Sequence, residues 1–273
     1  MIPNRSVSDG QTRVEKPPIL DNKNPSSPSV FRPAALLREA RRQKQLATLE
    51  VPQICILDPD GDIVRRLRDS GQAQPFEGWP CYHTRLDTFT LAGRTVGIVG
   101  CAVGAPFAVL VAEELFASGC RVLVSLTSAG QIVPAGTVPY FVIIERALRD
   151  EGTSYHYAAP SDYAEADRDL VAMAARALKS KNLQAVVGAT WTTDAPFRET
   201  HEAIEWAKSK NVLAVEMEAA ALYTFARATR VKVLCLAHVT NTMGQIEQDF
   251  EKGEADGTAD ALRVLEAITA AAM

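Results

Sequence analysis

Short apolar runs alternate with amphipathic segments along most of the chain. A short apolar run bounded by turns is typical of a buried strand, and apolar residues three and four apart are typical of a helix. The first pattern predicts strands over 54–57, 95–99, 121–126, 185–188, 211–215 and 232–239. The second predicts helices over 33–46, 63–70, 106–118, 166–179, 218–229 and 259–272. Apolar strands that alternate with helices indicate the α/β class, with a mixed sheet covered on both faces.

The first 30 residues differ from this pattern. Residues 1–30 are rich in Pro, Ser, Asn and charge and show little periodicity, which predicts a flexible tail. Residues 31–273 are predicted to form a single domain, because no repeat or second boundary interrupts them. The helix over 33–46 is basic, which favours a solvated surface helix, with an interface role in an oligomer as the alternative.

Charge and composition exclude several classes of function. The net charge of −4 gives no broad electrostatic reason to bind nucleic acid or an anionic membrane. No apolar run approaches the roughly 20 residues that span a bilayer, and no secretory signal pattern opens the sequence. The 5 cysteines lack metal-ligand spacing, so we interpret them as small core residues of a cytoplasmic protein without metal or cofactor.

Two carboxylates flank a methionine where a predicted strand gives way to an alanine-rich helix, in the sequence Glu216-Met217-Glu218. Acids rarely enter an apolar junction unless something satisfies them. Attraction to the helix dipole is one explanation. The other is a sugar site, in which Glu218 accepts hydrogen bonds from a vicinal diol and Met217 packs on the sugar's apolar face.

This segment resembles the ribose-binding signature of the nucleoside phosphorylase and nucleosidase superfamily. Four further stretches fit the family's order, which are 99–107, 123–130, 188–197 and 235–242. The resemblance as a whole spans about 53–272. It implies an α/β domain with a central mixed sheet flanked by helices. It also implies an enzyme that cleaves the N-glycosidic bond of a purine or pyrimidine nucleoside. We therefore expect a homo-oligomer, dimer-based and up to a hexamer, that takes a nucleoside and, in phosphorolytic members, inorganic phosphate.

The resemblance also implies roles for individual residues. The ribose side is expected at Glu216, Met217, Glu218 and Ser128. The phosphate or water side is expected at Gly104, Ser125 and Arg85. A glycine-bearing turn between a strand and a helix can present backbone N–H groups to an anion, although tight strand–helix packing explains it equally well.

Departures from the family concern the nucleophile. Phosphorolytic members usually carry Gly-Asp-Pro-x-Arg after the first strand, but here Asp58 and Asp62 replace the glycine and the arginine. Ser125 replaces a second arginine, and Arg85 lies near the position of a third. Reversing a charge about 4 Å from phosphate changes the energy by several kcal/mol at an effective dielectric of about 20. We therefore expect hydrolysis rather than phosphorolysis, with Asp62 as general base, unless the acidic loop is an outward-facing surface turn.

The base side is altered as well. Asn241 occupies the position where purine-cleaving members place a proton-donating aspartate, and asparagine cannot deliver a proton. Phe197 is expected to stack on the base, and Arg198 to face a carbonyl. Asp194 is a base-side candidate whose alternative is a turn or cap. A non-catalytic nucleoside-binding protein is the remaining alternative, which the intact Glu216-Met217-Glu218 segment opposes.

Overall fold

The computed structural model describes residues 17–21, 23–243, 249–250 and 252–272. Most of the predicted tail, 1–16, lies outside the described residues. The strands are β1 Ile54–Asp58, β2 Gln74–Pro75, β3 Asp87–Leu91, β4 Arg94–Gly100, β5 Val122–Gln131, β6 Tyr140–Asp150, β7 Tyr163–Glu165, β8 Ala185–Thr193, β9 Val212–Glu216 and β10 Lys232–Asn241. The helices are α1 Pro33–Lys44, α2 Asp62–Asp69, α3 Ala105–Ala117, α4 Arg168–Ser180, α5 His201–Ser209, α6 Ala219–Thr229 and α7 Thr258–Ala271, with 3-10 turns η1 Pro18–Leu20, η2 Thr153–His156 and η3 Pro196–Arg198.

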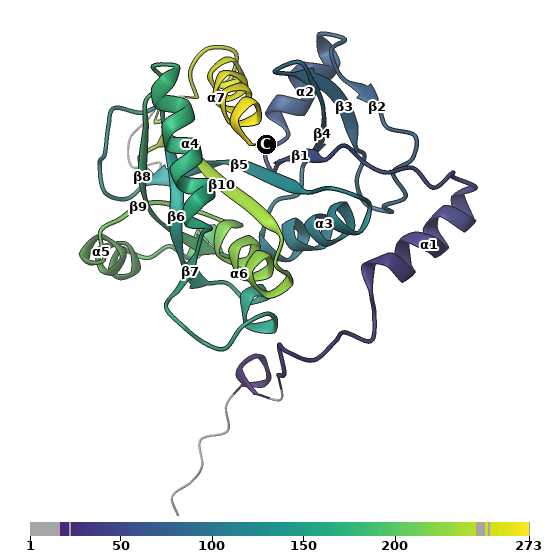
Figure 1. Cartoon of the computed structure of the whole chain (residues 1–273). Helices are drawn as coiled ribbons and strands as arrows, with labels where there is room; N and C mark the ends of the chain where they lie inside the picture. The colour runs from purple at the N-terminus through teal and green to yellow at the C-terminus, as the bar shows by residue number, and fades with distance from the viewer. Residues whose placement is uncertain (1–16, 22, 244–248, 251, 273) are drawn as a thin grey trace, which may run out of the picture.

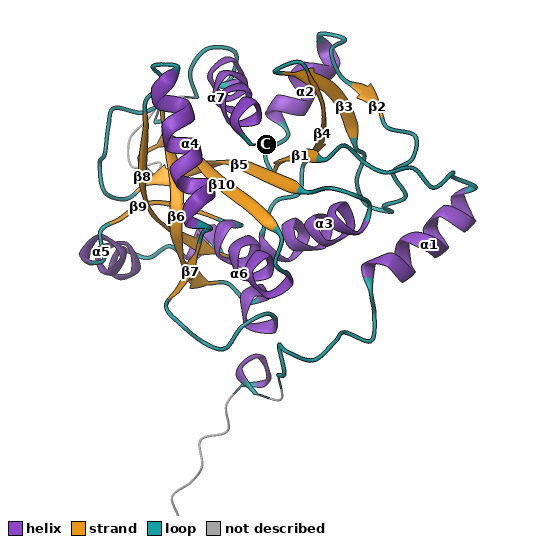
Figure 2. Cartoon of the chain, viewed as in Figure 1, coloured by secondary structure: helices purple, strands orange, loops and turns teal. Residues whose placement is uncertain are grey.

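The described strands form one ten-stranded mixed sheet (Figure 2). Its order is β10-β6-β8-β9-β5-β1-β4-β3-β2, with β7 beside β6. An additional pairing of β10 with β5 closes a ring of β5, β9, β8, β6 and β10. Strands β1, β4, β5 and β10 run parallel to their neighbours in this set, so their carboxyl ends meet at one edge.

Helices cover both faces of the sheet, as Figure 1 shows. One core cluster joins α3 and α6 to the sheet side that carries Leu123, and the other joins α2, α4 and α7 to the side that carries Val124. A smaller cluster packs α5 against Trp191 of β8. Both faces of β5 are buried, which explains its nearly continuous apolar sequence. The predicted fold class, a single α/β unit with a central mixed sheet flanked by helices, is confirmed.

Some expected boundaries are wrong in an informative way. Strand β5 continues to Gln131 rather than ending at 126, and β8 continues to Thr193 rather than ending at 188. Hydroxyl side chains hid these strand ends, because serine and threonine are common in turns. Helix α5 was not expected at all, and its sequence holds one buried residue, Ala207, which gives a weak periodic signal.

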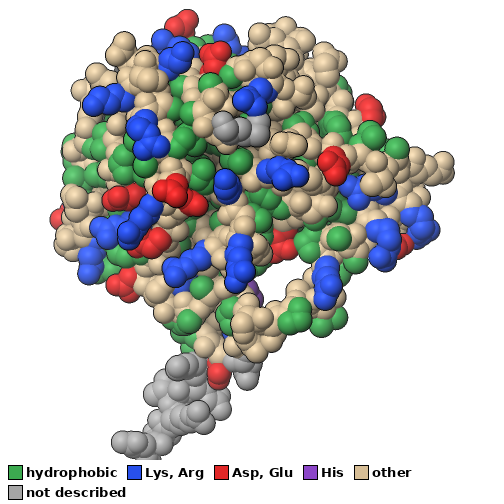
Figure 3. Space-filling view, in the orientation of Figure 1, with side chains coloured by type: hydrophobic (Ala, Val, Ile, Leu, Met, Phe, Trp, Pro, Cys, Tyr) green, Lys and Arg blue, Asp and Glu red, His purple; other side chains and the backbone are tan. Residues whose placement is uncertain are grey.

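The chain before β1 wraps one side of the domain. Helix α1 starts at Pro33, buries Leu37 and Ala40, and packs near α3. Its last residue is anchored, because Lys44 Nζ donates to the carbonyls of Pro80 and Cys81 at 2.9 and 2.6 Å. No helix among the described residues is long and apolar enough to cross a membrane. Acidic and basic side chains are interspersed over the face in Figure 3.

Candidate active site

Three segments that are far apart in sequence meet at the carboxyl edge of β1, β4 and β5. The loop after β1 meets the loop after β4, where the Cys101 amide donates to the Asp58 carbonyl at 3.0 Å. The loop after β4 meets the start of α6, where the Gly104 amide donates to Glu218 Oε1 at 2.7 Å. In open α/β sheets, ligands bind in the crevice outside the carboxyl ends of the strands. This edge is therefore the candidate site.

Glu218 lies at the centre of this edge. The residue is 1% exposed, and its Oε2 has no hydrogen-bond partner among the described residues. Burial, and then repulsion from Glu216, raise the pKa of Glu218 to about 8, although the Gly104 amide and the Thr127 hydroxyl favour the ionised form. A buried carboxylate oxygen without a partner is costly in a folded protein. Such an oxygen is available to accept a hydrogen bond from a sugar hydroxyl.

Backbone conformation explains why glycine stands opposite this carboxylate. Gly104 has φ +90°, a value that L side chains rarely adopt, and it directly precedes α3. In this conformation its amide points at Glu218 and leaves the carboxylate's second oxygen unpaired. Gly104, which was expected on the phosphate or water side, thus donates its amide to Glu218.

Glu216 makes different contacts. Its Oε1 accepts from Thr190 at 3.1 Å and from Thr192, and its Oε2 accepts from the amides of Glu218 and Ala219, both at 2.7 Å. Burial raises the pKa of Glu216, and these donors oppose the shift. Four donors occupy both oxygens, so Glu216 holds the β9–α6 junction together. The adjacent Met217 is partly exposed.

The acidic loop after β1 folds inward rather than forming an outward-facing turn. Asp58 is 2% exposed, and its Oδ2 accepts from the Val64 amide at 2.9 Å in the first turn of α2. Burial raises the pKa of Asp58 to about 7. Asp60 reaches β5, where Ser128 donates its amide and its hydroxyl to the two carboxylate oxygens at 2.7 and 2.9 Å. Ser128, expected on the ribose side, is therefore held by Asp60.

Asp62 is surrounded by cations. It pairs with Arg65, and Lys252 Nζ lies 2.5 Å from its Oδ2. Partial burial raises the pKa of Asp62, but the bonds from Lys252 and Arg65 outweigh burial and leave the pKa lowered. A carboxylate with a lowered pKa and two cationic partners is a poor proton acceptor at neutral pH. This geometry disfavours Asp62 as a general base.

Asn241, which was expected on the base side, lies at the end of β10 beside Gly130 of β5. Its Oδ1 accepts from the Met243 amide at 2.9 Å. A side chain added at Gly130 would fall 2.3 Å from Met243 Sδ, 3.2 Å from Asn241 Oδ1 and 3.4 Å from Val215. Met243, Asn241 and Val215 therefore surround Gly130 closely and leave no room for a side chain at this position.

The remaining residues that were predicted for the site differ in how exposed their side chains are. Phe197 is 99% exposed in η3, and Arg198 is exposed beside it. Asp194 is exposed, and its Oδ2 accepts from the Gly152 amide at 2.8 Å. Ser125 is 1% exposed, and its Oγ has no partner among the described residues. Arg85 is exposed.

The sequence matches the Phosphorylase superfamily over residues 53–270, most of the chain. The chain belongs to this superfamily. The resemblance that five motifs predicted is therefore confirmed, and with it the expected superfamily of nucleoside-cleaving enzymes.

The chain is also similar in sequence to individual members of the phosphorylase superfamily. The chain is 33% identical over 157 residues to a purine nucleoside phosphorylase DeoD-type of Exiguobacterium sibiricum, covering 56% of this chain and 66% of that protein. The match thus spans just under two thirds of that relative's length. The chain is also 26% identical over 199 residues to a uridine phosphorylase of Thermococcus kodakarensis, and this match covers 66% of this chain and 71% of that protein.

A solved structure supports the superfamily fold. The crystal structure of uridine phosphorylase from Vibrio fischeri ES114 superposes with a TM-score of 0.67 at 20% identity, covering 84% of this chain and 94% of that one. At this identity the likeness concerns the fold, and it agrees with the mixed sheet described above.

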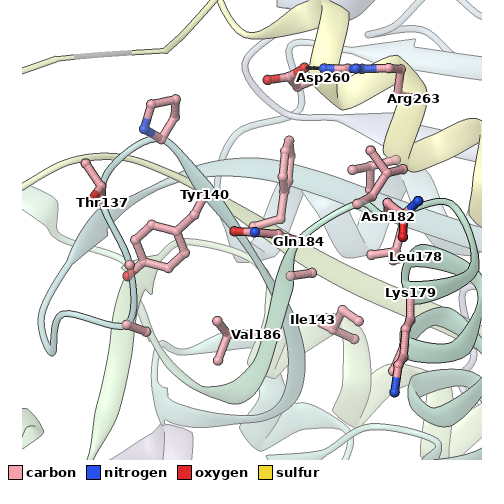
Figure 4. Close-up of a pocket in the computed structure, with 18 residues that line it drawn as sticks. Thr137, Tyr140, Ile143, Leu178, Lys179, Asn182, Gln184, Val186, Asp260 and Arg263 are labelled. Carbon is pink, nitrogen blue, oxygen red and sulfur yellow. Dashed lines mark hydrogen bonds and ion pairs between the residues drawn. The ribbon is translucent and has the colours of Figure 1, made fainter.

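A separate cavity of about 1030 Å³ lies away from these residues (Figure 4). Tyr140 and Val186 from the sheet, Lys179 at the end of α4 and Arg263 of α7 contribute to its walls. Arg263 is paired with Asp260, and none of the lining residues belongs to the candidate site. Within the described chain, no group of three or more His, Cys, Asp or Glu could hold a metal ion.

Proposed function

We propose that the protein cleaves the N-glycosidic bond of a nucleoside and transfers the pentose to inorganic phosphate. In this reaction the bond between C1′ and the base nitrogen breaks, and its electron pair stays with the nitrogen. A phosphate oxygen forms the new bond to C1′, and the proton of hydrogen phosphate goes to the departing base. The products are a pentose 1-phosphate and the free base.

The observation that carries this proposal is the buried Glu218 carboxylate with its unpaired Oε2. When ionised, a carboxylate only accepts hydrogen bonds, so it suits the two adjacent hydroxyls of a ribose. The Gly104 amide holds the carboxylate in place before the sugar arrives. A sugar fixed by its hydroxyls keeps C1′ in a constant position while the positive charge of an oxocarbenium-like ribosyl group develops.

Two considerations favour phosphate over water. The relatives described above are named phosphorylases, so the comparisons do not support the expected lean toward hydrolysis. Asp62, on which that expectation depended, is paired with Lys252 and Arg65. Hydrolysis keeps some support, because Asp62 and Ser125 stand at the places of two phosphate arginines.

Product analysis tests the proposal. The purified protein is incubated with a panel of purine and pyrimidine nucleosides, with and without added phosphate, and the products are separated. Base release that requires phosphate and yields pentose 1-phosphate supports the proposal. Base release in phosphate-free buffer with free ribose establishes hydrolysis instead. Binding of a nucleoside without any turnover establishes the non-catalytic alternative.

We further propose a dimer-based homo-oligomer in the cytoplasm. Apolar side chains are exposed on the segments that build the site, with Val103 51% exposed before Gly104 and Leu110 39% exposed on α3. Tyr82 is 44% exposed in the loop that also carries the exposed Arg85. An exposed apolar surface next to a site is typical of a subunit interface. Light scattering after size exclusion tests this, and a monomer at micromolar concentration contradicts it.

A further inference from the structure

An anion-binding arrangement at the end of β5 is occupied by the protein's own carboxylate. The amide and the hydroxyl of Ser128 both point to Asp60, at 2.7 Å from Oδ2 and 2.9 Å from Oδ1. Two convergent donors of this kind suit any oxyanion with two exposed oxygens, including phosphate. The two Ser128 donors therefore form a binding site for an oxyanion, and the Asp60 carboxylate of the same chain occupies this site.

The position of Asp60 is electrostatically crowded. Asp60 contributes to raising the pKa values of both Asp58 and Glu218, so its charge lies close to each of them. A carboxylate among like charges is held mainly by its donors, because repulsion disfavours it there. Asp60 itself is partly exposed, whereas Asp58 is buried and anchors the loop to α2. A rotation of the Asp60 side chain can thus release Ser128 without unfolding the loop.

Other groups around Asp60 point to an external anion. Asp60 and Ser128 line a small cavity together with Lys252 and His238. His238 is 6% exposed, and its Nε2 has no partner among the described residues. Burial lowers the pKa of His238 to about 4, so the neutral ring can carry a proton on Nε2 and donate it. The cavity measures about 20 Å³, which holds about one water molecule.

We propose that Asp60 sets the affinity for phosphate by occupying its donors, so that phosphate binds only when the Asp60 carboxylate leaves Ser128. Lys252 and His238 then supply the positive charge and the additional donor that the missing arginines do not. This inference rests on the proposed function, since it takes phosphate as the nucleophile. It explains how a site that contains Ser125 and an acidic loop can still use phosphate, at reduced affinity.

The test measures binding of inorganic phosphate to the full chain by calorimetry, without nucleoside. Asp60→Asn keeps an acceptor for Ser128 and removes the charge, and Asp60→Ala also empties the space. We expect both variants to bind phosphate at least tenfold more tightly than the wild type. Adding Ser128→Ala to Asp60→Ala should return the affinity toward the wild-type value, because phosphate then loses the hydroxyl donor.

Asp256→Asn is the matched control. Asp256 lines the same small cavity but is exposed, and its φ of 56° is a conformation that asparagine tolerates. It removes one negative charge without freeing Ser128, so its phosphate affinity should stay within about twofold of the wild type. An Asp60→Ala protein that is folded and binds phosphate no more tightly than Asp256→Asn overturns the proposal. Asp60 would then only tie the loop to β5.

The experiments distinguish a failure of the role proposed for Asp60 from a failure of the proposed reaction. Tighter phosphate binding by the Asp60 variants, in a protein that cleaves no nucleoside, supports the role of Asp60 and contradicts the reaction. Phosphate-dependent cleavage by the wild type, with unchanged binding in the Asp60 variants, supports the reaction and contradicts the role of Asp60.

Discussion

At the scale of single residues, the two glutamates of one short segment have opposite roles. Glu216 has both oxygens occupied by four protein donors, whereas Glu218 has one donor-bound oxygen and one without a partner. We therefore propose that the first carboxylate holds the site together and that the second faces the substrate. Sequence alone does not separate them, because both are acids at the same apolar junction.

Replacing Glu218 should impair sugar binding. Glu218→Gln keeps an acceptor for the Gly104 amide but removes the charge, and a hydrogen bond to a charged group contributes about 1.5–3 kcal/mol. That loss corresponds to a decrease of roughly 10- to 150-fold in kcat/KM for nucleoside. Glu202→Gln, on the exposed start of α5, is the control and should match the wild type. Wild-type efficiency in Glu218→Gln would show that another residue anchors the ribose.

The pKa of Glu218 predicts opposite pH trends for binding and stability. Burial first, and then Glu216, raise this pKa from 4.5 to about 8, so the ionised acceptor forms only as pH approaches 8. Nucleoside binding should therefore strengthen about tenfold per unit between pH 6 and 8. A raised pKa contributes stability below the unfolded-state value, and this contribution is lost as pH rises through the folded-state value.

Thermal melting from pH 5 to 9 checks the stability trend. Relative to Glu218→Gln, which cannot ionise at this position, the wild type should lose stability as pH rises toward 8 and above. Melting curves of the two proteins that stay parallel across this range would contradict the assignment of the shift to Glu218.

Asp62 should contribute little to the chemical step. Its lowered pKa and its bonds to Lys252 and Arg65 make it a structural charge at the start of α2. A general base typically contributes about 10²–10⁴-fold to the rate, so Asp62→Asn should keep kcat within about tenfold of the wild type. Steady-state kinetics provides the measurement. A fall of a hundredfold or more, in a protein with unchanged melting, would restore Asp62 as the base.

At the scale of elements, the junction of β9 with α6 depends on a buried carboxylate. Glu216 accepts from the first amides of α6 and from two threonines of β8, so it joins three elements. Glu216→Gln turns one acceptor into a donor that faces N–H groups, and leaving such groups unpaired costs about 1–3 kcal/mol each. The free energy of unfolding in urea should fall by at least that amount. Glu165→Gln, at the exposed end of β7, should leave it unchanged.

Sequence patterns predicted most elements because their apolar faces repeat regularly. Strands β1, β4 and β10 and helices α3, α6 and α7 occur within a few residues of the expected ranges. The strand ends that carry the site were missed, since Thr127, Ser128 and Thr192 have turn-like chemistry but lie in strands. Their role depends on what the neighbouring strand presents, and a local pattern carries no such information.

The hydrogen-bond and ion-pair partners of the site residues could not be predicted from the sequence either. Lys252 meets Asp62 across 190 positions, and Ser128 meets Asp60 across 68. Family motifs located Glu218 and Gly104 but not their mutual hydrogen bond. The two arginines considered as replacements, Arg85 and Arg198, are exposed, while the nearby cation is a lysine that lies outside every motif.

At the scale of the whole molecule, stability should come from the domain and α1 rather than from the chain before α1. Residues 21 and 23–32 are exposed, and Ile19 lies near Gly152, 3.1 Å from a side chain added there. Among the described residues, a chain that starts at Ser29 loses the contacts of η1 with η2, including this one. It should therefore keep its melting temperature within a few degrees, since few apolar groups become exposed.

A second truncation supplies the contrast. A chain that starts at Gln45 also loses α1, whose Leu37 and Ala40 are 0% exposed. Losing one buried leucine typically costs about 2–5 kcal/mol, so this chain should melt at a clearly lower temperature. The two truncations together decide whether α1 marks the beginning of the stable unit. If the chain that starts at Ser29 melts as early as the chain that starts at Gln45, the segment before Ser29 is docked and belongs to the folded unit.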